Sequence, residues 1–375
     1  MAWKGDEIWM FEHSRAAATG GPWPVVGMPS SVGVVNPGLS TWLFIAIAYV
    51  AASPVAMVIA VQVLNVLTLW GLYAFIAFAM PERARQPWLW GLILVSVSPL
   101  PIMFSRKIWA QDLLPAFSLL VLIGHWYRAR AWGGFLWGLA GALIGQIHMS
   151  GFFLAGSLAG WTIARDRKSA RWVPWLIGGA IGAVGVIPWV VQVLEHDGPE
   201  GRPWIEALTL RFYTRWIATA LGLNLPRTMG SEFWTGFLRE PVVAGVPTYL
   251  VALAHVFLVI VGLTIVVRWF RRESREAYRA LLDRFPDIRF YLEVTLVGVG
   301  LSMTLSRFLI SAHHLIVLIP FVHIWLAMKL HGRTRTLIAV AVAQLLISVS
   351  FLAYVHQHGG VPGGDYGTSF RQQVR

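Results

Sequence analysis

The chain has 375 residues, of which 57% are hydrophobic and only 13% are charged, and its mean hydropathy is +0.63. These values exclude an ordinary soluble domain and are typical of a polytopic helical membrane protein. The lack of cysteine excludes disulfides and thiolate metal sites, and the net charge of +12 does not indicate nucleic acid binding, because the basic residues lie in short segments between apolar stretches.

The amino-terminal segment carries an acidic pair, Asp6 and Glu7, close to its start. No signal peptide precedes the pair, so we expect that the first membrane span usual in such a protein is missing from this sequence. A short apolar stretch, 39–52, follows a Pro- and Gly-rich run. It is too short to span a bilayer well, and it predicts a helix that lies in or dips into the outer membrane interface.

Longer apolar segments follow, and each is a candidate membrane span, which needs roughly 17 to 25 residues. We predict spans at 55–80, 88–104, 112–127, 133–149, 150–164, 172–194, 245–267, 290–305, 313–330 and 336–356. Several are short, which implies tilt, local bilayer thinning or burial within the bundle. The predicted fold is therefore an all-α bundle of about ten transmembrane helices with outer loops and interfacial helices.

The segments between these spans alternate in charge. One set holds 18 of the 30 Lys and Arg residues and is predicted to be cytoplasmic by the positive-inside rule; it consists of 81–87, 128–132, 165–171, 268–289 and 329–335. The remaining segments are then outside. This divides the chain into an outer amino-terminal region at 1–54, a bundle at 55–356 that includes an outer loop at 195–244, and an outer tail at 357–375.

The cytoplasmic segment 268–289 has the pattern of an amphipathic basic helix. Its apolar side chains, Tyr278, Leu281, Leu282 and Phe285, fall on one side, and arginines occupy the others. Such a helix is expected to lie at the membrane surface, attracted to anionic lipid.

The outer segments carry side chains suited to acid-base chemistry and phosphate binding. Asp6 and Glu7 are carboxylates beside a bilayer, where such groups are either exposed to water or take part in the function of the protein. Arg106 and Lys107 either contact a phosphate or extend to the lipid headgroups. Asp112 is expected to pair with one of these cations or to help Asp6 bind a divalent metal.

A late outer segment holds Arg307, His313 and His314. Adjacent histidines point to different faces of a helix, which disfavours a two-histidine metal site. Binding of a phosphate or an acceptor by Arg307 and one histidine is the alternative. The outer loop 195–244 mixes aromatic and polar side chains, as a sugar or lipid site would, and an interfacial helix that covers the bundle is equally consistent with it.

The order of these motifs resembles the GT-C class of membrane glycosyltransferases, close to the protein O-mannosyltransferase and lipid A aminoarabinose transferase group. That group has an Asp-Glu pair in its first outer loop, a Pro-Pro-Leu-like step, a Ser-Pro stretch followed by Arg and Asp, and a late Arg and His before a Pro. The corresponding residues are Asp6, Glu7, Pro37, Gly38, Leu39, Ser98, Pro99, Arg106, Asp112, Arg307, His313, His314 and Pro320. The resemblance covers nearly the whole chain, although Gly38 replaces the second Pro and the segment near Gln146 and His148 lacks a Lys often found there.

The resemblance implies transfer of a sugar from a polyprenyl phosphate to a hydroxyl of a glycan, lipid or protein at the outer face of the plasma (inner) membrane, with inversion at the anomeric carbon. It assigns the base to Asp6 and an orienting role to Glu7. Donor phosphate or acceptor binding falls to Arg106, Lys107, Asp112, Arg307, His313 and His314. No cofactor is assigned, and a divalent cation bound by Asp6 and Asp112 stays open.

Two alternatives stay open: a transporter or flippase of lipid-linked saccharides, and an inactive truncated paralogue. A transporter is expected to carry inverted repeats and polar residues near the membrane midplane. The sequence shows no clear repeat, and its ionisable residues largely avoid the span centres, which favours the enzyme.

Overall fold

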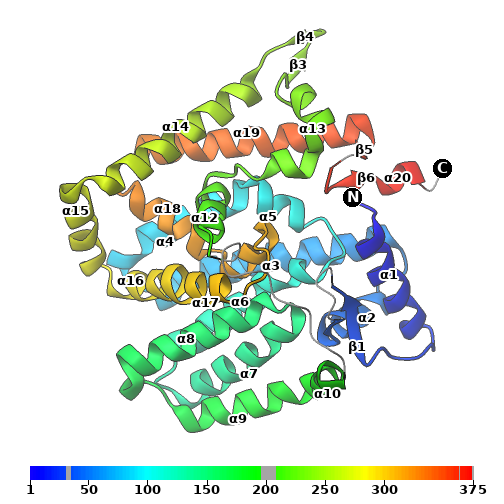
Figure 1. Ribbon diagram of the computed structural model, residues 1–375, viewed down its shortest axis with the longest axis vertical. Coiled ribbons are helices and arrows are strands. Elements are labelled where there is room, and N and C mark those ends of the chain that lie inside the picture. Colours follow the sequence, from blue (N-terminus) through cyan, green and yellow to red (C-terminus); the bar gives the residue numbers. More distant parts are fainter. Residues whose placement is uncertain (31–34, 196–207, 363, 374–375) are drawn as a thin grey trace.

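The computed structural model describes residues 1–30, 35–195, 208–362 and 364–373, and of Arg227 only the backbone. The protein is 76% helical, and its strands form short two-stranded hairpins (Figure 1). The all-α prediction is confirmed. Parts of three predicted outer segments lie outside the described residues: 31–34 in the amino-terminal region, 196–207 in the loop, and 363 and 374–375 in the tail.

The first half of the chain forms the amino-terminal region and the lower part of the bundle in Figure 1. Its elements are α1 (Gly5–Ala18), β1 (Val26–Pro29), β2 (Val35–Pro37), α2 (Leu39–Ala48), α3 (Pro54–Ala79), α4 (Glu82–Val97), α5 (Pro99–Phe104), η1 (Ala110–Leu113), α6 (Leu114–Trp126), α7 (Ala131–Ile147), α8 (Ser150–Asp166), η2 (Arg167–Ser169), α9 (Trp172–Ala183), η3 (Val184–Val186) and α10 (Ile187–Glu195). The strands β1 and β2 pair antiparallel.

The second half completes the bundle and returns to the amino terminus. Its elements are α12 (Arg211–Leu221), α13 (Leu225–Phe237), β3 (Val242–Val243), β4 (Val246–Pro247), α14 (Leu250–Phe270), α15 (Arg272–Asp283), α16 (Pro286–Glu293), the π-helical η4 (Val294–Val299), α17 (Gly300–Leu305), η5 (Ala312–Leu318), α18 (Phe321–Lys329), α19 (Thr334–His358), β5 (Gly360–Val361), β6 (Gly367–Thr368) and α20 (Phe370–Gln373). The carboxy-terminal tail lies beside α1, because Ala2 pairs with Ser369 in a β-bridge.

Local sequence explains where several of these helices begin and end. The Ser53 hydroxyl accepts the Ala56 N–H at 3.2 Å and Pro54 occupies the first turn, so α3 begins there. Pro99 separates α4 from α5 within one predicted span. The helix α12 ends at Gly222, whose φ of 73° is in the left-handed region that glycine adopts without strain.

Among the described residues, five helices are long and apolar enough to cross a membrane, and a sixth span is obtained if η5 and α18, bent by 84°, count as one. The five are Pro54–Ala79, Trp172–Glu195, Leu250–Phe270, Pro286–Leu305 and Thr334–His358. Helices also occupy the other predicted spans, but α4, α6, α7 and α8 are shorter than the 18 residues that a candidate span needs. The structure therefore indicates a membrane protein, without confirming about ten spans.

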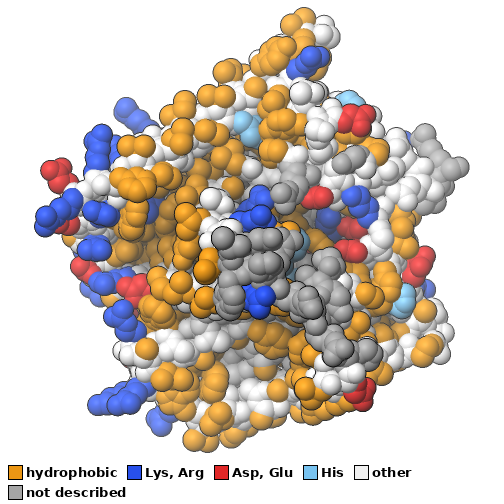
Figure 2. Space-filling model, in the orientation of Figure 1, with side chains coloured by type: hydrophobic (Ala, Val, Ile, Leu, Met, Phe, Trp, Pro, Cys, Tyr) orange, Lys and Arg blue, Asp and Glu red, His pale blue; other side chains and the backbone are white. Residues whose placement is uncertain are grey.

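The surface agrees with this assignment. Apolar side chains along α3 are exposed, among them Leu67 at 61%, Trp70 at 64% and Phe78 at 88%. In Figure 2 hydrophobic side chains cover much of the visible face, while Lys and Arg gather along its left edge, over α15 and near the turn between α8 and α9. The predicted amphipathic helix within 268–289 is confirmed as α15, which packs Tyr278 and Leu281 against the core.

Candidate active site

A cleft of about 460 Å³ lies where α1, the segment after α5, the α12–α13 region, η5 and the carboxy-terminal tail meet. The predicted residues Asp6, Glu7, Lys107 and His313 line it. The remaining lining residues are Lys4, Gly5, Leu100, Met103, Phe104, Trp109, Arg215, Asn224, Thr228, Ser311, Ala312 and Asp365. The fold therefore assembles one polar cleft from segments more than 300 residues apart in the sequence.

Glu7 and Lys107 form a buried ion pair at the base of this cleft. The Lys107 Nζ lies 3.2 Å from Glu7 Oε1, and these residues are 7% and 2% exposed. The Lys4 backbone N–H donates to Glu7 Oε2 at 3.3 Å, and the Lys107 ammonium lies 5.0 Å from the centre of the Trp109 ring. Glu7 is thus fixed by two donors, which suits an orienting role.

Asp6 differs from its neighbour because it is exposed at the cleft. Partial loss of water raises the pKa of its carboxyl above the ordinary 3.8, and the Glu7 charge adds to this rise, while Lys107 and Lys4 oppose it. An accessible carboxylate with a raised pKa is a better proton acceptor than an ordinary aspartate.

Asp112 lies in η1, outside the candidate spans, and is 1% exposed. Its Oδ2 accepts a hydrogen bond from the backbone N–H of Trp109 at 3.0 Å. Its Oδ1 is buried and makes no hydrogen bond among the described residues. Burial raises the pKa of Asp112 well above its ordinary value, with Lys107 opposing the rise. The expected ion pair with Arg106 or Lys107 does not form in the described part of the chain, since Lys107 pairs with Glu7.

A second, largely apolar cavity of about 380 Å³ adjoins the cleft. It lies between α3, α5, α6 and η5, and residues such as Leu69, Leu72 and Leu119 line it. Phe104 lines both spaces, and Asp112 lines the apolar one. The polar cleft is therefore bordered by a space suited to an apolar chain.

Arg106 does not line the cleft, although it precedes Lys107. It lines a different cavity of about 290 Å³, together with Met1, Tyr366 and Arg371. Its Nε is buried and makes no hydrogen bond among the described residues. Arg106 and Lys107 are consecutive in the sequence, yet they line two separate cavities.

The two late histidines lie together, with ring centres 4.2 Å apart, but they make different contacts. His313 lines the cleft and packs edge-to-face on Trp109 with ring centres 5.2 Å apart. His314 accepts the Ser311 N–H through Nδ1 at 2.9 Å and lies against His148, 5.6 Å away, so it supports the start of η5. Arg307 lies in the turn before η5 with a φ of 62° and is not among the residues that line the cleft.

Sequence reasoning missed several cleft residues, in particular Lys4, Arg215 and Asp365. The tail brings Asp365 to the cleft because the Lys4 Nζ donates to the Gly364 carbonyl at 2.6 Å and Tyr366 is buried. Arg215 comes from α12 within the predicted outer loop 195–244. No motif pointed to either residue, because tertiary packing alone brings both to the acidic pair.

Asp6 and Asp112 were the candidate metal ligands. The described residues contain no group of three or more His, Cys, Asp or Glu side chains arranged to hold a metal ion.

Comparisons with models of protein families, with curated protein sequences and with solved structures find no match to this chain.

Proposed function

We propose that this protein is a membrane glycosyltransferase that moves a sugar from a polyprenyl-phosphate donor to an acceptor hydroxyl. The observation that carries the proposal is the exposed Asp6, with its raised pKa, in a polar cleft that adjoins an apolar cavity. A lipid-linked sugar has the same two-part character. The resemblance of the outer motifs to GT-C enzymes supports the same assignment.

The polar and apolar linings of the two spaces match the two parts of such a donor. The sugar and phosphate would occupy the cleft, and the first isoprene units would lie in the apolar cavity beyond Phe104. Apolar pockets with a few convergent polar groups are typical of small-molecule sites.

The reaction then proceeds by direct displacement. Asp6 accepts the proton of the acceptor hydroxyl as its oxygen forms a bond to the anomeric carbon, and the bond between that carbon and the phosphate oxygen breaks. The electron pair leaves with the polyprenyl phosphate, whose charge Arg215 and Lys107 face across the cleft. Glu7 holds Lys107 in place through the 3.2 Å ion pair.

We further propose that the cleft faces the outside of the inner membrane, in a bundle of about ten spans. The basic segments that the positive-inside rule puts in the cytoplasm include α15 and the turn after α8, on the other side of Figure 1 from α1. The chain lacks cysteine, so single cysteines test this directly. In intact cells Ser231→Cys should react with an impermeant thiol reagent and Lys168→Cys should not; the opposite pattern would refute the assigned side.

The function is tested with purified protein and lipid extracts of the source cells. Asp6→Asn should lower the release of polyprenyl phosphate about 100- to 10,000-fold, because it removes the proton acceptor. Glu12→Gln, which neutralises an exposed acid of the same helix α1, is the matched control and should keep wild-type activity. Equal activity of the Asp6→Asn protein would contradict the proposal.

A further inference from the structure

Another cavity, which has cationic walls, lies far from Asp6 and Glu7. It measures about 400 Å³ and lies between α14, α15, α18 and the start of α19. Figure 1 places α15 and the amino terminus on opposite sides of the molecule. Arg268, Lys329 and Arg333 line this cavity, and no acidic side chain of the described residues does.

The Lys329 ammonium is held by aromatic rings rather than by a carboxylate. Its Nζ lies 3.4 Å from the centre of the Tyr278 ring and 4.1 Å from that of Trp269. Within the described part of the chain, none of the three cations forms an ion pair with Asp or Glu. Aromatic faces orient an ammonium without supplying a negative charge, so an anion can still approach it.

An independent observation concerns Tyr278. Its phenol oxygen is buried and has no hydrogen-bond partner among the described residues. A buried hydroxyl normally has a partner, and leaving one without costs roughly 1 to 3 kcal/mol. A ligand oxygen beside Lys329 would supply that partner.

Part of the cavity wall is apolar. Ile260, Val261 and Ile265 come from α14, which is one of the candidate membrane spans. At the end of that span Trp269 is 45% exposed and Phe270 is 76% exposed, as expected of side chains at a membrane interface. The cationic end of the cavity therefore lies at headgroup depth, and its apolar end lies along the span.

We propose that this cavity binds the phosphate headgroup of an anionic membrane lipid, with the first methylene groups of the lipid against α14. Arg268 and Arg333 offer planar donors for phosphate oxygens, Lys329 offers an ammonium whose charged form a bound phosphate favours, and Tyr278 offers a hydroxyl. The proposal does not depend on the glycosyltransferase assignment.

The experiment measures equilibrium binding of a fluorescent short-chain phosphatidylglycerol to the detergent-solubilised full chain. Unlabelled phosphatidylglycerol should displace it, and phosphatidylcholine at the same concentration should not. Lys329→Gln should weaken binding about tenfold or more, since it removes a charge-assisted contact. Arg279→Gln is the matched control, because it removes one positive charge from the exposed face of α15 outside the cavity.

Two further measurements keep the test decisive. Tyr278→Phe removes only the hydroxyl and should weaken binding several-fold, which covers the case that Lys329→Gln fails to fold. Inorganic phosphate at millimolar concentration should compete poorly; if it competes as well as the lipid, the lipid assignment is wrong. Equal losses in Lys329→Gln and Arg279→Gln would mean attraction to a basic surface and would overturn the site.

Discussion

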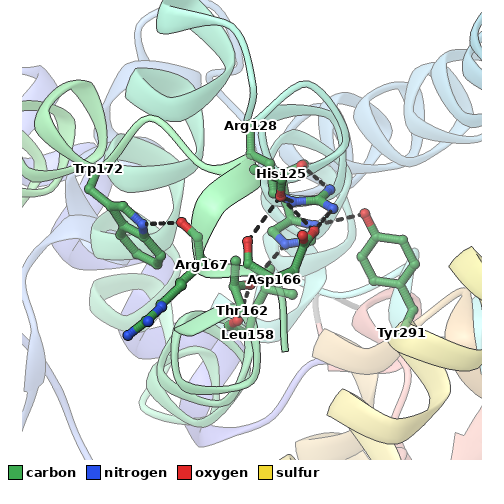
Figure 3. A network of polar contacts seen from close by, with 9 residues as sticks. His125, Arg128, Leu158, Thr162, Asp166, Arg167, Trp172 and Tyr291 are labelled. Carbon is green, nitrogen blue, oxygen red and sulfur yellow. Dashed lines mark hydrogen bonds and ion pairs between the residues drawn. The ribbon is translucent and has the colours of Figure 1, made fainter. Parts of the chain in front are cut away.

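Two polar regions of this molecule differ in how completely their hydrogen bonds are made. The first ties α6, α8 and α16 together around His125 (Figure 3). Its Nδ1 lies 2.8 Å from the Tyr291 hydroxyl, and its Nε2 lies 3.0 Å from the Thr162 hydroxyl. Arg128 pairs with Asp166 and also donates to the His125 carbonyl at 3.1 Å. Buried groups in this network have partners, as expected of a structural feature.

The acidic cleft is different. Buried polar atoms in it or beside it have no hydrogen-bond partner among the described residues: Asp112 Oδ1, Gln111 Oε1, Asn224 Oδ1 and Arg106 Nε. Each such atom costs free energy unless a ligand or water meets it. We infer that the His125 network stabilises the fold, and that the polar atoms without hydrogen-bond partners at the cleft bind a substrate. The predictions below test this division.

The largest expected effect follows from removing the cation between the buried acids. Lys107→Met leaves Glu7, which is 2% exposed, and Asp112, which is 1% exposed, without their nearby positive charge. Breaking a buried pair in this way costs about 3 to 5 kcal/mol. Unfolding of the purified protein in detergent should show this loss, and Lys168→Met, at an exposed site, should be close to wild type.

The pH dependence of this loss has a definite sign. Lys107 opposes the rise in the pKa of Asp112, so without Lys107 the folded-state pKa rises further above the unfolded value. The stability contribution of such a group is present at low pH and is lost as pH rises through the folded pKa. The difference between Lys107→Met and wild type should therefore shrink on acidification. A constant difference would mean that packing, and not charge, causes it.

The sequence predicted the helices well because their apolar runs are long, and it predicted α15 from its amphipathic pattern. It also assigned Asp6, Glu7, Lys107 and His313 to one site, and these four residues line the same cleft. It could not separate Arg106 from Lys107, or His313 from His314, because the local backbone decides where adjacent side chains point. It could not predict the tail residue Asp365, since tertiary contacts such as the hydrogen bond from Lys4 to the Gly364 carbonyl and the Ala2–Ser369 bridge bring the tail to the cleft.

Donor binding sharpens the distinction between the cleft and its surroundings. Arg215 lines the cleft and Arg106 does not. Arg215→Lys keeps the charge but loses the planar fork, so the apparent donor affinity should fall by about 1 to 3 kcal/mol. Arg106→Lys and Arg307→Lys should change it less. Donor saturation curves measure this, and the reverse ranking would return the phosphate site to Arg106.

A smaller effect is expected from the His125 network. His125→Leu leaves the Tyr291 hydroxyl and the Thr162 hydroxyl without their ring partner, at a cost of about 1 to 2 kcal/mol in unfolding free energy. The double variant with Tyr291→Phe should recover part of this loss, because one orphaned hydroxyl is removed. Transfer per folded molecule should not change. Loss of activity without loss of stability would give this network a functional role and break the division.

The smallest effect concerns the titration of Asp6. A general base works when deprotonated, so the rate should rise with pH through the folded-state pKa of Asp6, which lies above the ordinary 3.8. Because Asp6 binds its proton more tightly when folded, it favours folding below its unfolded pKa and loses that contribution as pH rises through the folded pKa.

Lys4 opposes the rise in the pKa of Asp6, and its effect is smaller than the effects of burial, Glu7 and Lys107. Lys4→Gln should therefore move the acidic limb of the kcat/KM profile to slightly higher pH, while Arg15→Gln, at the other end of α1, should leave it in place. The shift is small, but its direction is informative, because a merely structural loss at Lys4 lowers the rate without moving the limb. A limb that stays fixed in Lys4→Gln, or moves to lower pH, would show that the titrating base is a group other than Asp6.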